Sequence, residues 1–358
     1  MSSIASSAIS TKSSTGLVKR MIPFSWGIVK QLTTVAVTIL ALLAVTFFIG
    51  RIMPIDPVVA VVGDRATPEV YAQVRAQLGL DQPLWTQFSL YLKDIFNGDL
   101  GFSQSTGNPV FDDIKEFFPA TLELATLGMI VGTLLGIPLG IFAALKRGQW
   151  QDNFIRVFSL IGYSTPVFWL GLIGLFIFYA QLDWVAGPGR LDIGYDFLVE
   201  PVTGLILIDS AMVGEWEVFF NAVAHLILPV TLLGYFSMAY IGRMTRSLML
   251  DELEKEYVVT AKVKGVSTWN IITKHCLRNI RVPLITILAL SYASLLEGAV
   301  LTETVFAWPG LGAYITSALF SADMPAVLGG TLVVGVCFVT LNLLAELAYP
   351  LLDPRVKR

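Results

Sequence analysis

Hydrophobic residues along this chain are grouped into six blocks separated by polar segments. Each block has about 20 apolar residues, which is long enough for a helix to cross the hydrocarbon core of a bilayer. The blocks lie near residues 31–50, 120–145, 157–181, 222–242, 283–302 and 326–350. The pattern therefore predicts an all-α integral membrane protein with six transmembrane helices.

The basic residues are distributed unevenly among the polar segments. If the segment before residue 31 is cytoplasmic, 18 of the 24 Lys and Arg residues lie on the inside and 6 on the outside. Cytoplasmic loops carry such an excess, so we expect both ends of the chain to lie in the cytoplasm. The expected parts are a tail at 1–30, the first span at 31–50, an outside segment at 51–118, a five-helix core at 119–350 that includes loops at 182–221 (outside) and 243–282 (inside), and a tail at 351–358.

The outside segment at 51–118 is too long for a simple connection between two spans. Thr67 is placed as an N-cap, Pro68 as the first helical residue and Gly79 as the stop of one helix. The stretch "PLWTQFSLYLKDIF" is a second amphipathic helix. We therefore expect a small helical subdomain outside the membrane, between the first and second spans.

Composition supports a membrane protein and excludes some other classes. The chain is 55% hydrophobic, and its mean hydropathy is +0.70. The net charge of −3 is too small to suggest binding to nucleic acid. Cys276 and Cys337 form no CxxC or Cys/His cluster, so we interpret them as packing residues and expect neither a disulfide nor a metal site.

Four glycines recur every four residues in the second apolar block: Gly128, Gly132, Gly136 and Gly140. This spacing places them on one ridge of a helix, where two backbones can approach closely. A helix-packing seam is the favoured interpretation, and the general enrichment of glycine in membrane helices is the alternative.

No constellation typical of an enzyme is present in the sequence. There is no GxxxxGK[ST] phosphate loop and no HExxH, and "GYSTP" at 162–166 lacks the second glycine of a nucleophile elbow. We therefore predict no catalytic residue, no metal site and no cofactor bound by this chain.

Carboxylates near membrane depth are costly and mark candidate functional positions. Glu123 and Glu346 are predicted near helix ends, where water or snorkelling of the side chain can solvate the carboxylate. Glu297 is predicted in the outer half of the fifth span. It either lines a substrate pathway, where it would meet a cationic group, or is solvated at the helix mouth.

The segment from Arg243 to Arg281 is unusually charged, with eight Lys/Arg and four acidic residues. Gly265 is placed to end one helix in the left-handed conformation, and Ser267 to cap the next. This predicts a helix–glycine–helix unit at the cytoplasmic surface. Its apolar stripe is predicted to dock into a soluble partner, while an amphipathic helix on anionic lipid is the alternative. The stripe consists of Leu250, Leu253, Tyr257 and Ala261, and Trp269, Ile272 and Cys276 form a face of the second helix.

The stretch from Glu256 through Gly265 to Pro283 resembles the cytoplasmic loop of ABC importer permeases. The chain after residue 30 is similar to the first inner-membrane subunit of the dipeptide/oligopeptide permease family. Besides that loop, the resemblance is carried by "ATPEVYAQVRAQLGLDQPL", "GDLGFS", "PATLEL", "STPVFWLG", "TGLILIDS", "HLILPVTLLG", "LTETVFAWPGLG" and "NLLAELAYPLLDPR", in this order. At Glu297 the family commonly has glycine.

The resemblance implies a type I ABC importer permease with the MetI-like fold, in a bacterial inner membrane. It implies a heterodimer with a second homologous permease, two ATP-binding subunits that hold ATP and Mg²⁺, and a periplasmic or lipid-anchored solute-binding protein. The charged loop would be the coupling helix that inserts into an ATPase subunit. The positions carried over for that role are Glu256, Tyr257, Ala261, Lys264 and Gly265.

Di- or oligopeptides are the expected cargo, moved by alternating access. Nickel chelates, oligosaccharides and opine-like compounds stay open, because relatives in the family carry them. A stand-alone secondary transporter or channel is the rival from another class, and the nearly charge-free spans disfavour it. An intramembrane enzyme is disfavoured because paired catalytic residues are missing.

Overall fold

The computed structural model describes residues 15–52, 57–63, 65–77 and 79–352, and all structural statements below refer to these residues. The outer parts of the two expected tails, 1–14 and 353–358, lie outside them. The described chain is helical, and its only β-type pairing is an isolated bridge between Phe102 and Pro109.

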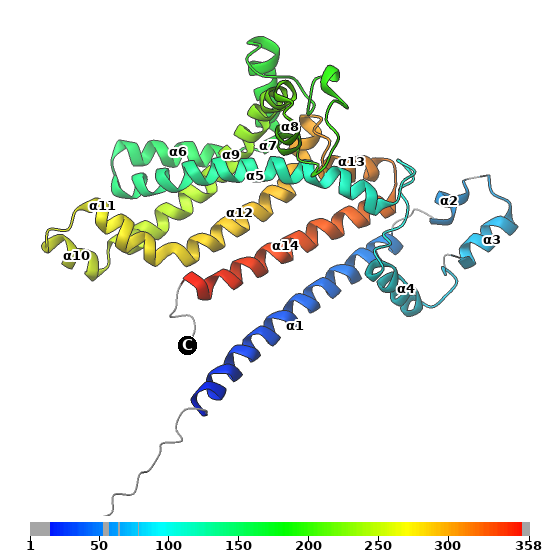
Figure 1. The fold of residues 1–358 in the computed structure, drawn as a ribbon, viewed down its shortest axis with the longest axis horizontal. Helices are drawn as coiled ribbons and strands as arrows, with labels where there is room; N and C mark the ends of the chain where they lie inside the picture. Colours follow the sequence, from blue (N-terminus) through cyan, green and yellow to red (C-terminus); the bar gives the residue numbers. More distant parts are fainter. Residues whose placement is uncertain (1–14, 53–56, 64, 78, 353–358) are drawn as a thin grey trace, which may run out of the picture.

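Five long helices in the described chain are apolar enough to cross a membrane (Figure 1). Their bounds are α1 Thr15–Ile52, α5 Val110–Leu145, α9 Trp216–Leu253, α12 Leu277–Val305 and α14 Met324–Leu352. The apolar part of α1 is Thr33–Arg51. At 1.5 Å per residue, the 38 residues of α9 extend about 57 Å, so this helix projects well beyond a hydrocarbon core of about 30 Å.

The third apolar block does not form one straight helix. It is divided into α6, Trp150–Ser164, and a continuation made of α7, Val167–Gly174, and the π-helix η1, Leu175–Gln181. The two parts are bent by 99°. Thr165 is extended, with φ −90° and ψ 133°, because the ring of Pro166 disfavours helical conformation in the residue before it. The described chain thus has five candidate spans, or six if this bent pair counts as one.

The centre of the bundle is the close pairing of α5 with α9. Gly128 lies against Leu233, Gly132 against Ser237, Gly136 against Ile241 and Gly140 against Gly242, so the two helices run parallel. A Cβ added at Gly132 would lie 2.5 Å from the Cβ of Ser237, and one at Gly140 would lie 2.5 Å from the Gly242 carbonyl oxygen. Only glycine at these positions allows the observed distance between the two backbones.

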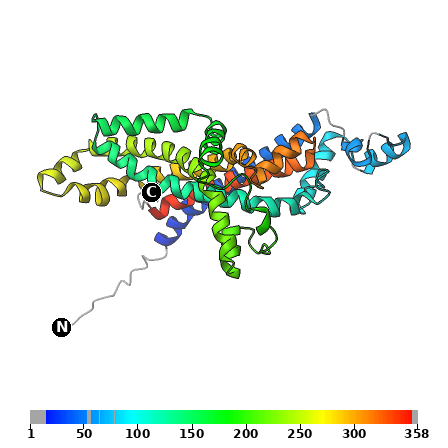
Figure 2. The same ribbon diagram turned by 90° about the horizontal axis from the view of Figure 1, so that it is seen from above.

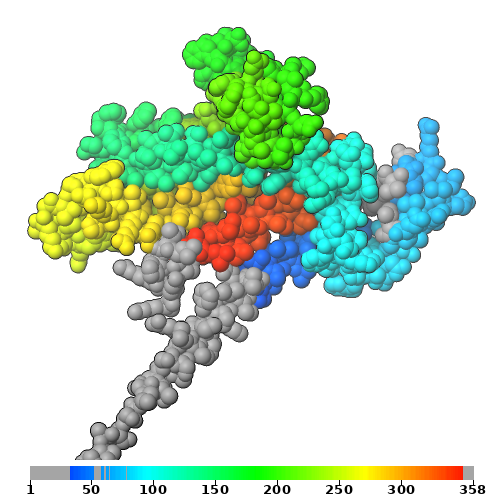
Figure 3. All heavy atoms as spheres, viewed as in Figure 1, coloured from blue at the N-terminus to red at the C-terminus, as the bar shows by residue number. Residues whose placement is uncertain are grey.

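The remaining short helices are gathered at three places. Helices α2 Pro57–Val62, α3 Pro68–Gln77 and α4 Leu84–Phe96 form one end of the molecule, and α10 Glu256–Val263, α11 Thr268–Asn270 and the π-helix η3 Ile271–Cys276 form the opposite end (Figures 1 and 2). The 3₁₀-helix η2 Ile193–Tyr195 and helix α8 Ile206–Val213 lie in the segment before α9, and α13 Leu311–Phe320 lies between α12 and α14. The space-filling view shows the 243–282 segment projecting from the bundle at one extreme (Figure 3).

Helix α13 is held against the bundle by a buried carboxylate. Glu303, which is fully buried, accepts hydrogen bonds from the Thr121 hydroxyl at 2.5 Å and from the Ala313 backbone N–H at 2.9 Å. The Thr121 oxygen in turn accepts the Leu311 N–H at 2.7 Å. A Cβ added at Gly310 would lie 2.4 Å from the Glu303 carboxyl carbon, so a glycine there gives the carboxylate access to the first turn of α13.

Candidate functional site

The charged segment folds as two short helices joined by a glycine turn. Helix α9 ends at Leu253, α10 begins at Glu256, and Gly265 follows α10 with φ +77°. No atom outside its immediate neighbours lies within 4 Å of a Cβ built at Gly265, so the backbone conformation and not crowding requires glycine there. The Ser267 hydroxyl accepts the Asn270 N–H at 3.4 Å and caps the following helix.

A hydrophobic cluster beneath the two helices attaches them to the long spans. Its buried members come from the end of α5, the end of α9, helix α10, η3 and the start of α12: Ala144, Met249, Val258, Ile271, Ile272, Cys276 and Ile280. Because both ends of the segment pack into one cluster, the unit is joined to α9 and α12 without a loose linker.

The structure corrects the predicted orientation of the apolar stripe. Leu250, Leu253, Tyr257 and Ala261 pack against the cluster of the chain's own residues instead of facing solvent. The Tyr257 hydroxyl donates to the Cys276 sulfur at 3.7 Å, and burial raises the pKa of this tyrosine, which stays neutral. On the second helix, Ile272 and Cys276 are also buried. These residues therefore hold the unit together.

The exposed apolar face consists of three other residues, Val259, Val263 and Trp269. Val259 and Val263 are one helical turn apart on α10, and Trp269 lies on α11 beyond the glycine turn. Val263 is 83% exposed and Trp269 is 72% exposed. Sequence reasoning missed the two valines, although the i, i+4 pair of β-branched residues was visible in "EYVVTAKVKG". We call Val259, Val263 and Trp269 the exposed coupling face.

The charges of this segment divide into two groups. Some belong to contacts within the chain: Arg246 makes a bidentate ion pair with the buried Asp152 of α6, at 2.6 and 2.8 Å, Lys255 pairs with Glu252 at 2.5 Å, and Arg147 pairs with Glu254. Glu256, Lys262 and Lys264 are exposed and make no ion pair within the described part of the chain. They carry charge of both signs and neighbour Val259 and Val263 along the chain.

The other predicted site residues lie elsewhere in the bundle. Glu297 is exposed on α12, about 30 Å along the helix axis from the start of that helix at Leu277, which is the end nearer the 256–265 residues. Because α12 runs to Val305, Glu297 lies about 12 Å along the helix axis from that end. The described residues hold no group of three His, Cys, Asp or Glu side chains that could bind a metal ion.

The sequence placed Glu123 near a solvated helix end, and this prediction is wrong. Helix α5 begins at Val110, so Glu123 is inside it and buried. Its carboxylate accepts from Arg190 at 2.6 Å and from the Leu207 N–H at 3.0 Å, while Arg190 also donates to the Gly204 carbonyl at 2.8 Å. The negative charge of Glu123 is thus compensated by Arg190, and this buried pair anchors the 182–221 segment to α5.

Comparison with known proteins assigns both halves of the chain. Residues 136–358 match the family described as "Binding-protein-dependent transport system inner membrane component", and residues 21–125 match its N-terminal counterpart, "Binding-prot-dependent transport system membrane comp, N-term".

Three curated relatives were compared along nearly their whole length. The probable D,D-dipeptide transport system permease protein DdpB of Escherichia coli (strain K12) is 44% identical over 93% of this chain and 98% of its own. The dipeptide transport system permease protein DppB of the same strain is 41% identical, and the di/tripeptide transport system permease protein DppB of Pseudomonas aeruginosa (strain UCBPP-PA14) is 40% identical, each over 92% of this chain and 98% of its own.

Proposed function

The chain belongs to the family of binding-protein-dependent transport system inner membrane components, and on that premise we propose that it is the peptide-translocating permease subunit of an ATP-driven importer. The observation that carries the proposal is the likeness to dipeptide and di/tripeptide permeases. It extends over at least 92% of this chain and 98% of each of these relatives. Its cargo is a di- or oligopeptide. It pairs with a second homologous permease, and a solute-binding protein delivers the cargo.

ATP hydrolysis belongs to partner subunits in this proposal, and the chain itself is not catalytic. The exposed coupling face, rimmed by Glu256, Lys262 and Lys264, is the surface that docks into an ATPase subunit. Three exposed apolar side chains surrounded by charges of both signs have the composition of a protein interface, with an apolar centre and a polar rim. Tyr257 and Ala261 contribute from beneath, by holding α10 on the cluster.

We call the segment from α10 to η3, residues 256–276, the coupling unit. The proposed orientation has both ends of the chain and this coupling unit in the cytoplasm. The 18 to 6 division of Lys and Arg supports it. The separation of α10 and α11 from α2, α3 and α4, at opposite ends of the molecule, also agrees with it (Figure 1). The helical subdomain of residues 51–118 then lies on the periplasmic side, where it helps to receive the solute-binding protein.

Closure of two ATPase subunits would move the coupling units of the two permeases toward each other. Since α10 and η3 share one hydrophobic cluster with the ends of α5 and α9 and the start of α12, this movement tilts the long helices as a group. The glycine seam between α5 and α9 keeps that pair rigid during the movement. Opening then occurs on the periplasmic side, which is the alternating-access mechanism.

Glu297 is proposed to line the translocation pathway. Its carboxylate is exposed on the surface of this single chain, within a segment long and apolar enough to span the membrane. A charged side chain facing lipid at that depth is costly, so the exposed side of α12 at Glu297 faces a water-filled path or the second permease. There the carboxylate would favour cargo that carries a cationic group.

Uptake assays test both the cargo and the role of Glu297. In a host from which the gene is deleted, the wild-type chain should restore uptake of a radiolabelled neutral dipeptide and of a lysine-containing dipeptide. Glu297→Gln should lower uptake of the lysine-containing dipeptide by roughly tenfold, the worth of one hydrogen bond to a charged group, and that of the neutral one much less. The matched control Glu217→Gln, at an exposed position in the first turn of α9, should leave both unchanged.

The two parts of that experiment fail in different ways. If the wild-type chain restores uptake of neither dipeptide, the peptide cargo is wrong. If Glu297→Gln lowers uptake of both peptides equally, the Glu297 carboxylate does not discriminate between cationic and neutral cargo. The proposal of a peptide cargo still holds after that result.

The turn at Gly265 gives a test of the coupling unit that does not depend on cargo. Gly265→Val should reduce the amount of ATPase that co-purifies with the chain, because a β-branched residue at φ +77° is strained by about 1–3 kcal/mol and displaces α11 relative to α10. Gly265→Asn should retain the ATPase, since asparagine tolerates the left-handed conformation. Both variants should insert into the membrane at wild-type levels. Equal ATPase recovery with the two variants would contradict the role of this turn.

A further inference from the structure

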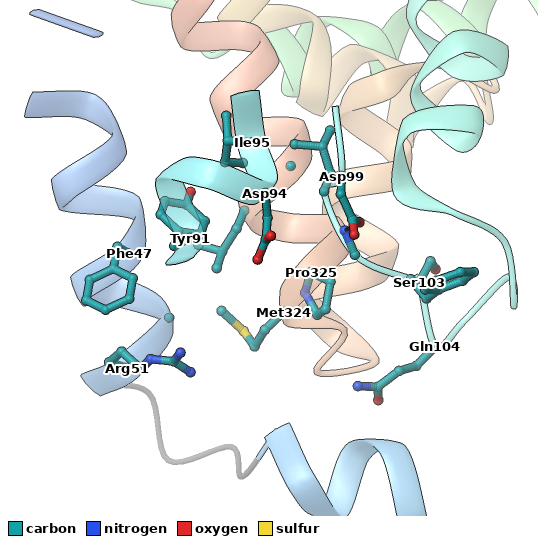
Figure 4. A pocket seen from close by; sticks show the side chains of 16 residues that line it. Phe47, Arg51, Tyr91, Asp94, Ile95, Asp99, Ser103, Gln104, Met324 and Pro325 are labelled. Carbon is teal, nitrogen blue, oxygen red and sulfur yellow. Dashed lines mark hydrogen bonds between the residues drawn. The ribbon is translucent and has the colours of Figure 1, made fainter. Parts of the chain in front are cut away.

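A cavity of about 680 Å³ lies at the end of the molecule that carries α2, α3 and α4, far from the coupling unit. It is open to solvent and is lined by the last turn of the apolar part of α1, by α4, by the loop at 99–104 and by the first turns of α14 (Figure 4). This volume falls within the range of about 300–1,000 Å³ that is typical of small-molecule sites. The cavity belongs neither to the α5–α9 centre of the bundle nor to the proposed coupling surface.

The walls of the cavity are mainly apolar and are rigidly held. Phe47 of α1 packs against Tyr91 of α4 in a tilted arrangement, with 5.6 Å between ring centroids, and the Tyr91 hydroxyl is hydrogen-bonded to Thr46 at 3.0 Å. On the other side, Met324 and Pro325 begin α14 and reach into the cavity (Figure 4). The site is therefore a preformed pocket where α4 packs on α1.

Charged groups of opposite sign line this apolar pocket without neutralising one another. The Arg51 guanidinium lies over the Phe47 ring at 5.3 Å and makes no ion pair within the described part of the chain. The Asp94 carboxylate, which points into the pocket from α4, likewise has no ion-pair partner there (Figure 4). Asp99 accepts the Gly101 N–H at 2.9 Å. Arg51 and Asp94 are both exposed, so a ligand that carries both an anion and a cation can reach the two side chains together.

The level of the pocket along the spans indicates where such a ligand comes from. Arg51 is the last residue of one candidate span, Thr33–Arg51, and Met324 is the first of another, Met324–Tyr349, so the pocket lies where spans leave the hydrocarbon. On α4, which contributes Tyr91 and Asp94 to the pocket, Trp85 is 80% exposed and Phe96 is 81% exposed. Exposed aromatic side chains at that level are typical of the interface between lipid headgroups and water.

We propose that this pocket binds the headgroup of a phospholipid with a primary ammonium group, such as phosphatidylethanolamine. Arg51 binds the phosphate, Asp94 and Asp99 receive the ammonium, and the apolar wall formed by Phe47, Met324 and Pro325 contacts the glycerol and the first acyl carbons. Two carboxylates against one guanidinium disfavour a headgroup with net negative charge. The bound lipid joins α4 to α1 and α14, so it secures the helical subdomain to the membrane part.

Native mass spectrometry of the full chain, purified in mild detergent with the subunits that accompany it, tests the proposal. The complex is titrated with phosphatidylethanolamine, phosphatidylglycerol or phosphatidylcholine of identical acyl chains. Wild-type protein should bind phosphatidylethanolamine roughly tenfold more tightly than either other lipid, because one charge-assisted hydrogen bond more is worth about that factor. Asp94→Asn should reduce the preference over phosphatidylcholine, because only Asp99 then receives the ammonium, and the trimethylammonium of phosphatidylcholine donates no hydrogen bond. Arg51→Gln should weaken binding of all three.

Controls separate this pocket from general lipid contact. Arg65→Gln and Asp81→Asn, exposed positions that do not line the pocket, should bind all three lipids as the wild type does. Equal affinity of the wild-type protein for the three lipids, or Arg51→Gln and Asp94→Asn variants that behave like the controls, would overturn the proposal. So would displacement of the bound lipid by a free dipeptide in a manner that depends on Asp94, since the pocket would then be a peptide site.

Discussion

Val263→Asp is expected to abolish co-purification of the ATPase subunit while leaving the chain itself folded and inserted. Val263 is the most exposed residue of the exposed coupling face, so a charge there costs the isolated chain little. Inside the proposed interface the same carboxylate would be desolvated without a partner, at a cost of roughly 2 kcal/mol or more in binding free energy, which is about thirtyfold or more in Kd. Trp269→Ala should have an effect of similar size, because it removes the largest apolar contact of the surface.

The measurement is the ratio of ATPase to permease after affinity purification, together with uptake. Val70→Asp is a matched control, since Val70 is an exposed valine in the first turn of α3 at the other end of the molecule. This control should keep the ATPase ratio of the wild type. If Val263→Asp and Val70→Asp recover the same amount of ATPase, the docking surface is not Val259, Val263 and Trp269.

Glu303→Leu should lower the stability of the chain more than any change to its exposed surface. The carboxylate is fully buried and accepts from Thr121 and from the backbone of α13, so its removal leaves these donors without partners. Each unsatisfied buried donor costs about 1–3 kcal/mol. We expect the unfolding midpoint of the purified complex to fall by roughly 5–10 °C. Glu303→Gln should be less severe, because the amide keeps one acceptor.

A thermal unfolding series in detergent measures this effect. Glu116→Leu is the control, because Glu116 is exposed on the same helix as Thr121. Thr121→Val, which removes one donor and one acceptor of the same network, should fall between the control and Glu303→Leu. A Glu303→Leu variant that melts with the control would show that the carboxylate does not hold α13.

The sequence alone supports the main plan of the molecule. Apolar blocks of about 20 residues require helices in a bilayer, because unpaired backbone groups are too costly there. The glycine turn at Gly265 and the cap at Ser267 were also readable, since each depends on one residue and its immediate neighbours. Family membership and the likeness to peptide permeases agree with the resemblance found in "LTETVFAWPGLG" and the other motifs.

Local rules locate some features without fixing their geometry, and they do not extend to features that depend on distant residues. The apolar block at 157–181 predicts a span, yet Thr165 and Pro166 bend it by 99°. Proline in a helix produces a range of outcomes, from a slight kink to a break, and the neighbours decide between them. The structural roles of Glu123 and Glu303 depend on Arg190 and Thr121, their hydrogen-bond partners, which are 67 and 182 positions away in the sequence.

The sequence by itself determined which stretches form the long helices, which loops carry the basic charge and where the helix–glycine–helix unit lies along the chain. Tertiary structure decided which side of that unit is exposed. Helical period shows that Tyr257 and Ala261 share one face and Val259 and Val263 another, but both faces of α10 are partly apolar. Only the cluster formed with Met249, Ile272 and Cys276 selects the first face for burial, and Val263 and Trp269 stay exposed.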